Sequence, residues 1–149
     1  MKLSVFADVS LRAILVLAAL EPGTTLSSRA IATAVGIPFN HVSKAVSGLA
    51  RHGLVEVTFG RTGGARLSVA GRTASVGQIL RLLDSRDDVA DCVGDHATCP
   101  LIGECALRHA LADAREAFYA ALDHLVAASL PTPGQMTPVF ATIGLRPHL

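Results

Sequence analysis

The chain has 149 residues, of which 50% are hydrophobic and 17% are charged. This length suits one domain, or a small domain with an appendage, and the apolar fraction excludes a wholly disordered chain. No uninterrupted apolar run is long enough to cross a bilayer, and the sequence shows no secretory signal. We therefore expect a cytoplasmic protein without a membrane partner.

The net charge of +1 hides a division between the two halves of the chain. Residues 1–72 carry eight Lys and Arg against three Asp and Glu, a balance of +5. Residues 73–149 carry five Arg against nine Asp and Glu, a balance of −4. A basic N-terminal half favours contact with a polyanion, although ordinary variation in surface charge explains the division equally well.

The first predicted helix covers residues 8–20. Asp8 or Ser10 can cap it, because short polar side chains accept hydrogen bonds from the first free amides of a helix. Apolar residues recur along it at helical spacing, and Glu21-Pro22-Gly23 ends it.

Two shorter helices follow, over residues 29–35 and from Ile37-Pro38 to Arg51. Ala32 is small enough to let the two helices approach closely, and Gly36 tolerates the positive φ that the turn requires. This spacing is typical of a helix-turn-helix.

A β-hairpin is predicted next, with strands over residues 54–58 and 66–69 and a glycine-rich tip that carries Arg61. Gly71 breaks the pattern, and a further helix begins after Ser75 and runs to Leu83. The fold class expected for residues 1–83 is therefore mainly α with a small β-hairpin, a winged helix-turn-helix that binds DNA.

In a helix-turn-helix, the N-terminal residues of the second helix enter the major groove. Ser28 and Arg29, which open the preceding helix, suit a phosphate, and Arg61 suits a minor groove. Each residue can instead be a cap or a solvated side chain, and a winged helix that only docks proteins stays open as an alternative. The side chains expected to contact bases or phosphates from the second helix are Asn40, His41, Ser43, Lys44 and Ser47.

Residues 84–104 have no regular period and are expected to form a metal-binding loop. Cys92, Cys99 and Cys105 are the whole thiol inventory, and an odd number within 14 residues is a poor disulfide framework. Zinc sites bring closer cysteine pairs, so these wider spacings favour an iron–sulfur cluster. Three thiols leave one iron position open, for a nearby His, Asp or Glu or for a group from a dimer partner.

The remaining sequence divides into a helix and a tail. Residues 105–130 contain neither glycine nor proline, and their apolar residues recur at heptad spacing. We therefore expect one long dimerisation helix. Residues 131–149 hold four prolines and two glycines and are expected to be a loose C-terminal tail.

The opening Lys-Leu-x-x-Phe-x-Asp-x-x-Leu-Arg, the Gly-Arg-x-Gly-Gly wing, the three cysteines and the long helix together resemble a family of bacterial regulators, the one that contains IscR and NsrR. The likeness covers residues 1 to about 130 and is strongest to the nitric-oxide-sensing repressors of NsrR type. It implies a homodimer whose long helices cross, bound to double-stranded operator DNA. It also implies that nitrosylation of a cluster releases the DNA.

The resemblance also implies a ligand set. In NsrR-type proteins three cysteines bind a [4Fe-4S] cluster, and the fourth ligand is an aspartate of the other subunit, a position at which this chain has Asp8. In IscR-type proteins a histidine three residues after the last cysteine completes a [2Fe-2S] site. Here that position is Arg108, and His109 comes one residue later.

Two other functions remain open at this point. One is an IscR-like regulator of redox or iron–sulfur status with a [2Fe-2S] cluster. The other is an electron-transfer or cluster-carrier protein that does not bind DNA. We do not expect an enzyme, because no histidine has a nucleophile or base at recognisable spacing and no phosphate-binding loop is present.

Overall fold

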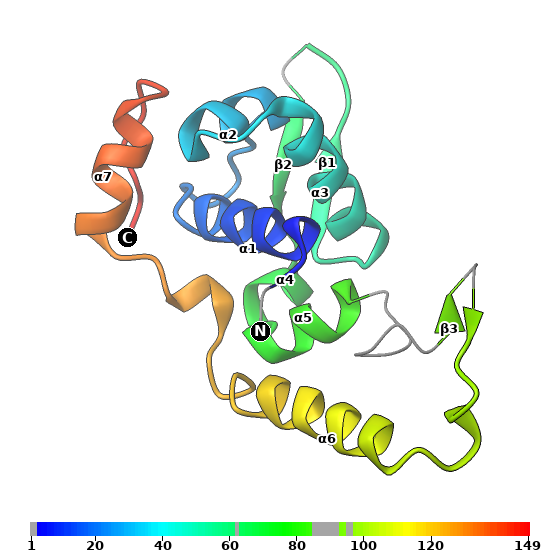
Figure 1. Cartoon of the computed structure of the whole chain (residues 1–149). Helices are drawn as coiled ribbons and strands as arrows, with labels where there is room; N and C mark the ends of the chain where they lie inside the picture. Colours follow the sequence, from blue (N-terminus) through cyan, green and yellow to red (C-terminus); the bar gives the residue numbers. More distant parts are fainter. Residues whose placement is uncertain (1–2, 62, 85–92, 95–96) are drawn as a thin grey trace.

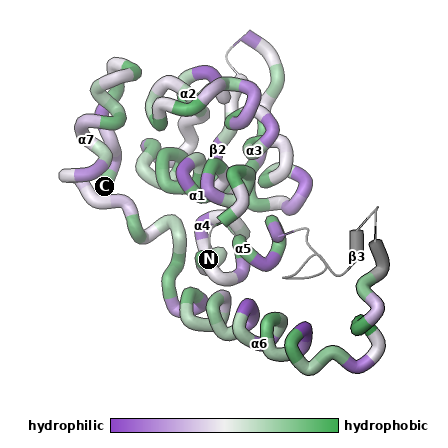
Figure 2. Tube along the Cα trace, viewed as in Figure 1, coloured by the Kyte–Doolittle hydropathy of each residue, from purple (hydrophilic) through white to green (hydrophobic). Residues whose placement is uncertain are grey.

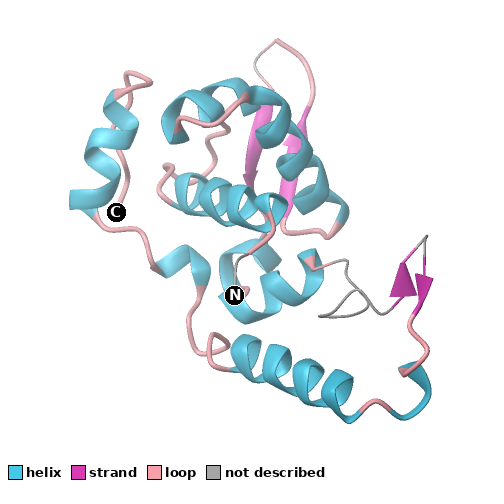
Figure 3. Cartoon of the chain, in the orientation of Figure 1, coloured by secondary structure: helices cyan, strands magenta, loops and turns pink. Residues whose placement is uncertain are grey.

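The structure is a computed structural model that describes residues 3–61, 63–84, 93–94 and 97–149. It is mainly helical with a small antiparallel hairpin, as expected (Figures 1 and 3). No helix among these residues is both long and apolar enough to cross a membrane. The elements in chain order are α1 (Val5–Ala18), α2 (Ser28–Val35), α3 (Phe39–Arg51), β1 (Val55–Thr58), β2 (Gly64–Leu67), α4 (Val69–Thr73), α5 (Val76–Leu83), β3 (Val93–Gly94), β4 (Ala97–Thr98), the 3-10 turn η1 (Ile102–Glu104), α6 (Ala106–Ala120), the 3-10 turn η2 (Ala127–Ser129) and α7 (Pro133–Ala141).

Helix α1 lies at the centre of the domain, with α2, α3 and the β1–β2 hairpin on one side of it and α5 on another (Figure 1). Its residues Ile14 and Leu17 are almost wholly buried, and so are Ile31 of α2 and Leu49 of α3. Burying such aliphatic side chains stabilises the fold by about 2 kcal/mol each. The core thus fixes the two helices of the helix-turn-helix against α1.

Helix α1 begins three residues earlier than predicted. Ser4 is its N-cap, with its hydroxyl accepting a hydrogen bond from the Ala7 amide at 3.1 Å. Neither Asp8 nor Ser10 caps the helix, and Ser10 is instead fully buried within it. The sequence has short polar residues at positions 4, 8 and 10, and the structure uses Ser4 as the cap.

The helix-turn-helix prediction is confirmed in its geometry. Gly36 ends α2 with a φ of +66°, in the left-handed region that glycine adopts without strain. The returning strand lies two residues earlier than predicted, because Val55 pairs with Leu67 and Thr58 with Gly64. Val69 then starts α4, and Gly71 lies inside this helix, where a Cβ would collide with the Leu54 carbonyl.

The prediction of one continuous helix over residues 105–130 is wrong. Helix α6 ends at Ala120, and the chain then turns back toward α5. The Val76 amide donates to the Leu125 carbonyl at 2.8 Å, and the Ala127 amide donates to the Ala74 carbonyl at 3.1 Å. These backbone bonds between distant segments replace the last turns that heptad spacing alone would favour.

The expectation of a loose tail is also wrong. Residues 133–141 form α7, which has Pro133 in its first turn. Proline is tolerated there because an amide at that position would have no partner within the helix. Phe140 is fully buried and Met136 is nearly so, and the His148 amide donates to the Ala19 carbonyl at 2.8 Å. The C-terminal segment is therefore part of the core, packed against α2.

Replacing Phe140 with alanine should destabilise this packing. Removing a fully buried phenylalanine side chain costs about 3 kcal/mol, because it loses apolar contacts and leaves a cavity. Thermal and urea unfolding of Phe140→Ala should show the loss, whereas Gln135→Ala on the exposed side of α7 should unfold like the wild type. Equal stability of the two variants would mean that α7 does not pack as described.

An ion-pair network joins α6 to α5. The Arg81 guanidinium binds the Glu116 carboxylate at 2.5 Å and the Asp123 carboxylate at 2.7 Å, and it lies 5.6 Å from the centre of the Tyr119 ring. The Tyr119 hydroxyl donates to Asp84. Hydrogen bonds from Arg81 lower the pKa of both Glu116 and Asp123, and they raise the pKa of Arg81 itself.

Arg81→Gln should therefore lower the melting temperature at neutral pH. Because the two carboxyl pKa values are lowered in the folded chain, their contribution is complete above the ordinary values of 4.5 and 3.8 and is lost as the pH falls through the lowered values. The difference between wild type and variant should shrink in acid.

Melting curves measured across this pH range test the prediction. Arg66→Gln is a matched control, since it breaks the exposed Arg66–Glu56 pair within the hairpin and leaves α6 untouched. A destabilisation by Arg81→Gln that stays constant as the pH falls would contradict the stabilising role of the ion pairs with Glu116 and Asp123.

Candidate nucleic-acid interface and metal centre

Helix α3 has one buried side and one polar side. Val42, Ala45, Val46 and Leu49 face the core. On the other side the described structure exposes four of the five side chains predicted to contact DNA, and it half-buries the fifth, Ser43; the exposed four are Asn40, His41, Lys44 and Ser47. Asn40 does not cap the helix, because Pro38 occupies the N-cap position. The helix is therefore amphipathic in the way that a helix lying in a DNA groove requires.

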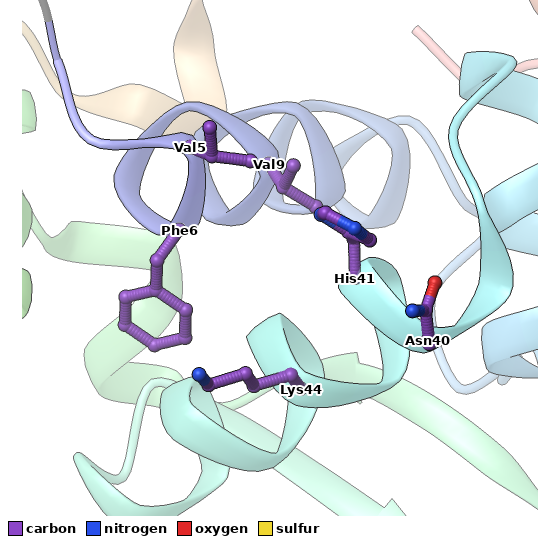
Figure 4. Close-up of a pocket in the computed structure, with 6 residues that line it drawn as sticks. All are labelled: Val5, Phe6, Val9, Asn40, His41 and Lys44. Carbon is purple, nitrogen blue, oxygen red and sulfur yellow. The ribbon is translucent and has the colours of Figure 1, made fainter.

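The first turn of α1 borders the N-terminal half of α3. Between them lies a hollow of about 330 Å³, with Val5, Phe6 and Val9 on one wall and Asn40, His41 and Lys44 on the other (Figure 4). Three of the predicted DNA contacts thus share a surface with the turn that carries Asp8. Their arrangement depends on how α1 and α3 pack.

The N-terminus of α2 presents Ser28 and Arg29 beside α3. Ser27 caps the helix, accepting a hydrogen bond from the Ala30 amide, which leaves Ser28 in the first turn. The Arg29 guanidinium lies 5.0 Å from the centre of the Phe39 ring, so a cation–π contact orients it. Phe39 was not among the predicted site residues; its signal in the sequence is an aromatic residue directly after Pro38.

The hairpin carries Arg61 at its exposed tip. Phe59, which was not predicted either, is 90% exposed beside it, so the tip offers an apolar surface as well as a charge. Arg66 on β2 pairs with Glu56 at 2.8 Å, which leaves its charge largely neutralised. Arg61 is thus better placed than Arg66 to meet a phosphate backbone.

The cysteine segment leads directly into α6. Cys99 and Cys105 are free, half-buried thiols separated by the η1 turn, and the Ile102 amide donates to the Cys99 carbonyl at 3.1 Å. Cys105 is the N-cap residue of α6. Cysteine sulfur is the ligand that holds iron–sulfur clusters in proteins. Cys92 lies outside the described residues.

Asp8 lies in the first turn of α1. Its carboxylate accepts a hydrogen bond from Arg12 Nε at 3.1 Å, and its side chain is 45% exposed. Nowhere among the described residues do three His, Cys, Asp or Glu side chains come close enough to hold a metal, so Asp8 does not join Cys99 and Cys105 within this part of one chain. The donors suit iron chemically, but the described part of one chain does not assemble them.

Comparison with known proteins places these features in a family. Residues 3–131 match the family model Rrf2, described as iron-dependent transcriptional regulator. The chain is 46% identical over 131 residues to the HTH-type transcriptional repressor NsrR of Streptomyces coelicolor, covering 87% of this chain and 88% of that protein. It is 33% identical over 124 residues to the HTH-type transcriptional regulator NsrR of Bacillus subtilis, covering 83% and 85%.

Solved structures show the same fold. The global cysteine regulator CymR of B. subtilis superposes with a TM-score of 0.64 at 24% identity, covering 87% of this chain and 95% of that one. IscR of T. potens gives a TM-score of 0.64 at 19% identity, covering 87% and 85%. The chain is a DNA-binding transcriptional regulator rather than an enzyme, and it belongs to the Rrf2 family.

Proposed function

We propose that the protein is a homodimeric repressor that binds operator DNA and releases it in response to nitric oxide, through a [4Fe-4S] cluster. The observation that carries the proposal is the position of the cysteine segment, which enters α6 at Cys105 while α6 docks on the DNA-binding domain through Arg81. A change at the cysteines is therefore connected to the orientation of the domain. The likeness to repressors named NsrR supports the choice of signal.

Helix α6 is the surface proposed for dimerisation. Leu107 is 67% exposed at its start, and Leu111, Ala114 and Phe118 continue the heptad spacing to the point where the helix ends. Figure 2 shows hydrophobic residues along the length of this helix, which runs below the rest of the domain. A second copy of α6 would cover the exposed part of this seam, because apolar seams of this period pack helix against helix. Phe118, at its end, already packs against the core of its own domain.

The proposed cluster ligands are Cys92, Cys99 and Cys105 of one subunit and Asp8 of the partner subunit. The bound cluster supplies iron that reacts with nitric oxide. Within the chain, the proposed ligand Cys105 directly precedes the first residue of α6, and the proposed ligand Asp8 lies in the first turn of α1. Loss of either ligand therefore removes a restraint between the two subunits, and DNA binding and ligand binding stabilise the same dimer.

The proposed DNA contacts divide into two kinds. Ser28 and Arg29 at the N-terminus of α2, and Arg61 on the hairpin, contact phosphates or a minor groove, which positions the protein. Asn40, His41, Ser43, Lys44 and Ser47 on α3 reach base edges in the major groove. Two such helices, one from each subunit, would read the half-sites of a pseudo-palindromic operator.

Arg29→Gln should weaken binding to operator and unrelated duplex DNA alike. Loss of one phosphate contact should reduce the slope of log affinity against log salt by about 1. Arg72→Gln, which removes an exposed arginine on α4, should leave this slope unchanged. Fluorescence anisotropy at several salt concentrations measures both, and a salt-independent affinity of the wild type would favour the electron-transfer or cluster-carrier alternative.

An anaerobic gel shift tests the sensing proposal. Cluster-loaded protein should bind the operator about tenfold or more tightly than apo or nitric-oxide-treated protein, a typical size for coupling between two sites. Equal binding by all three would overturn it. Iron and sulfide analysis and the absorption spectrum distinguish the [4Fe-4S] form from an IscR-like [2Fe-2S] form.

Asp8→Ala should change the absorption spectrum of the loaded protein and its response to nitric oxide, while the chain remains folded, because Asp8 is exposed and does not cap α1. Asp113→Ala, at an exposed carboxylate on α6, is the control and should leave the spectrum as in the wild type. An unchanged spectrum and response in Asp8→Ala would remove Asp8 from the ligand set.

A further inference from the structure

Phe6 of α1 packs directly on the backbone of α3, the proposed DNA-recognition helix. Gly48 is buried within α3, and a Cβ placed on it would lie 3.0 Å from Cε2 of the Phe6 ring and closer still to Cζ. Cβ atoms essentially never approach another atom so closely. The ring therefore occupies the space that any side chain at position 48 would need, and the first turn of α1 rests on α3 at this point.

The Phe6 ring is not enclosed by close packing on its other sides. It borders the 330 Å³ hollow that contains Asn40 and His41 (Figure 4), and it also borders a second hollow of about 450 Å³, whose walls include Arg51 and Leu82. Lys44 lines both hollows. These hollows leave part of the ring without close neighbours, so its position can follow that of the first turn of α1.

Phe6 and Asp8 belong to the same helical turn. Backbone hydrogen bonds hold the residues of a helical turn together, so a shift of the turn at Asp8 would carry the backbone of Phe6 with it. The ring lies against α3 one turn beyond Lys44. A displacement of the ring would therefore shift α3, which carries the predicted base contacts.

We infer that the contact between Phe6 and Gly48 transmits the state of the first turn of α1 to the recognition helix. Phe6 acts as a positioning residue, because its ring rests on α3 at a backbone position that has no side chain. The inference rests on the proposed function, since Asp8 is the group through which the signal would reach this turn.

The test compares Phe6→Ala with Val5→Ala. Val5 lies in the same turn and is 57% exposed, but Phe6 supplies the atoms that meet Gly48. In anaerobic operator titrations, loaded Phe6→Ala should keep the absorption spectrum of the wild type, yet its affinity should fall to within about twofold of its nitric-oxide-treated form. Val5→Ala should keep the full ratio of the wild type.

Gly48→Ala provides a second test of the contact, because the added methyl group displaces the Phe6 ring while Phe6 itself is kept. This variant should also lose the affinity ratio while keeping the spectrum. It keeps the proposal testable if Phe6→Ala fails to fold, as judged by circular dichroism.

Hydrogen exchange on the cluster-free chain gives a readout that needs no metal. The α3 amides of residues 42–48 should exchange faster in Phe6→Ala than in Val5→Ala, because the helix has lost its support. Unchanged exchange, or a wild-type affinity ratio in both Phe6→Ala and Gly48→Ala, would overturn the inference alone. Equal affinity of loaded and treated wild-type protein would instead overturn the proposed function, and this inference with it.

Discussion

The burial of α1 is the constraint on which the rest of the structure depends. This helix packs against α2, α3, α5 and β2, so it fixes the helix-turn-helix, the hairpin and the start of the C-terminal half in one frame. Its first turn is different in character, because Asp8 is exposed there and Phe6 borders two hollows. The same helix thus combines a buried body with a first turn that carries a partly exposed carboxylate and an aromatic ring resting on α3.

The attachment of α6 to this frame combines a charged network with apolar packing, because Tyr119 is buried in the core and Phe118 packs against it. Arg81 binds Glu116 and Asp123, and the backbone around Leu125 bonds to the start of α5. Near the start of α6, Leu107 is 67% exposed and Leu111 is half-buried. The second half of the helix thus holds it to its own domain, through Glu116 as well as Phe118 and Tyr119, whereas Leu107 near its start is exposed.

The proposed metal centre follows from the same division. The described residues place Cys99 and Cys105 at the entrance to α6 and place Asp8 on α1, and they do not bring the three together in one chain. A site shared between subunits would make cluster, dimer and DNA orientation depend on one another. The role of the three cysteines was suggested by their spacing, but no spacing argument can show a ligand that comes from another chain, and for Asp8 only the family resemblance pointed to one.

The sequence by itself determined the local features. Gly36 fixed the turn between α2 and α3, the alternation around a glycine-rich tip specified the hairpin, and Ser75 specified the start of α5, because each acts through neighbours a few residues away. Tertiary contacts decided the rest. Helix α6 ends at Ala120 because residues 74–76 bond to the chain beyond it, and the proline-rich tail folds because Met136 and Phe140 find an apolar surface to cover. The partners in both cases are distant in sequence, so neither periodicity nor composition could reveal them.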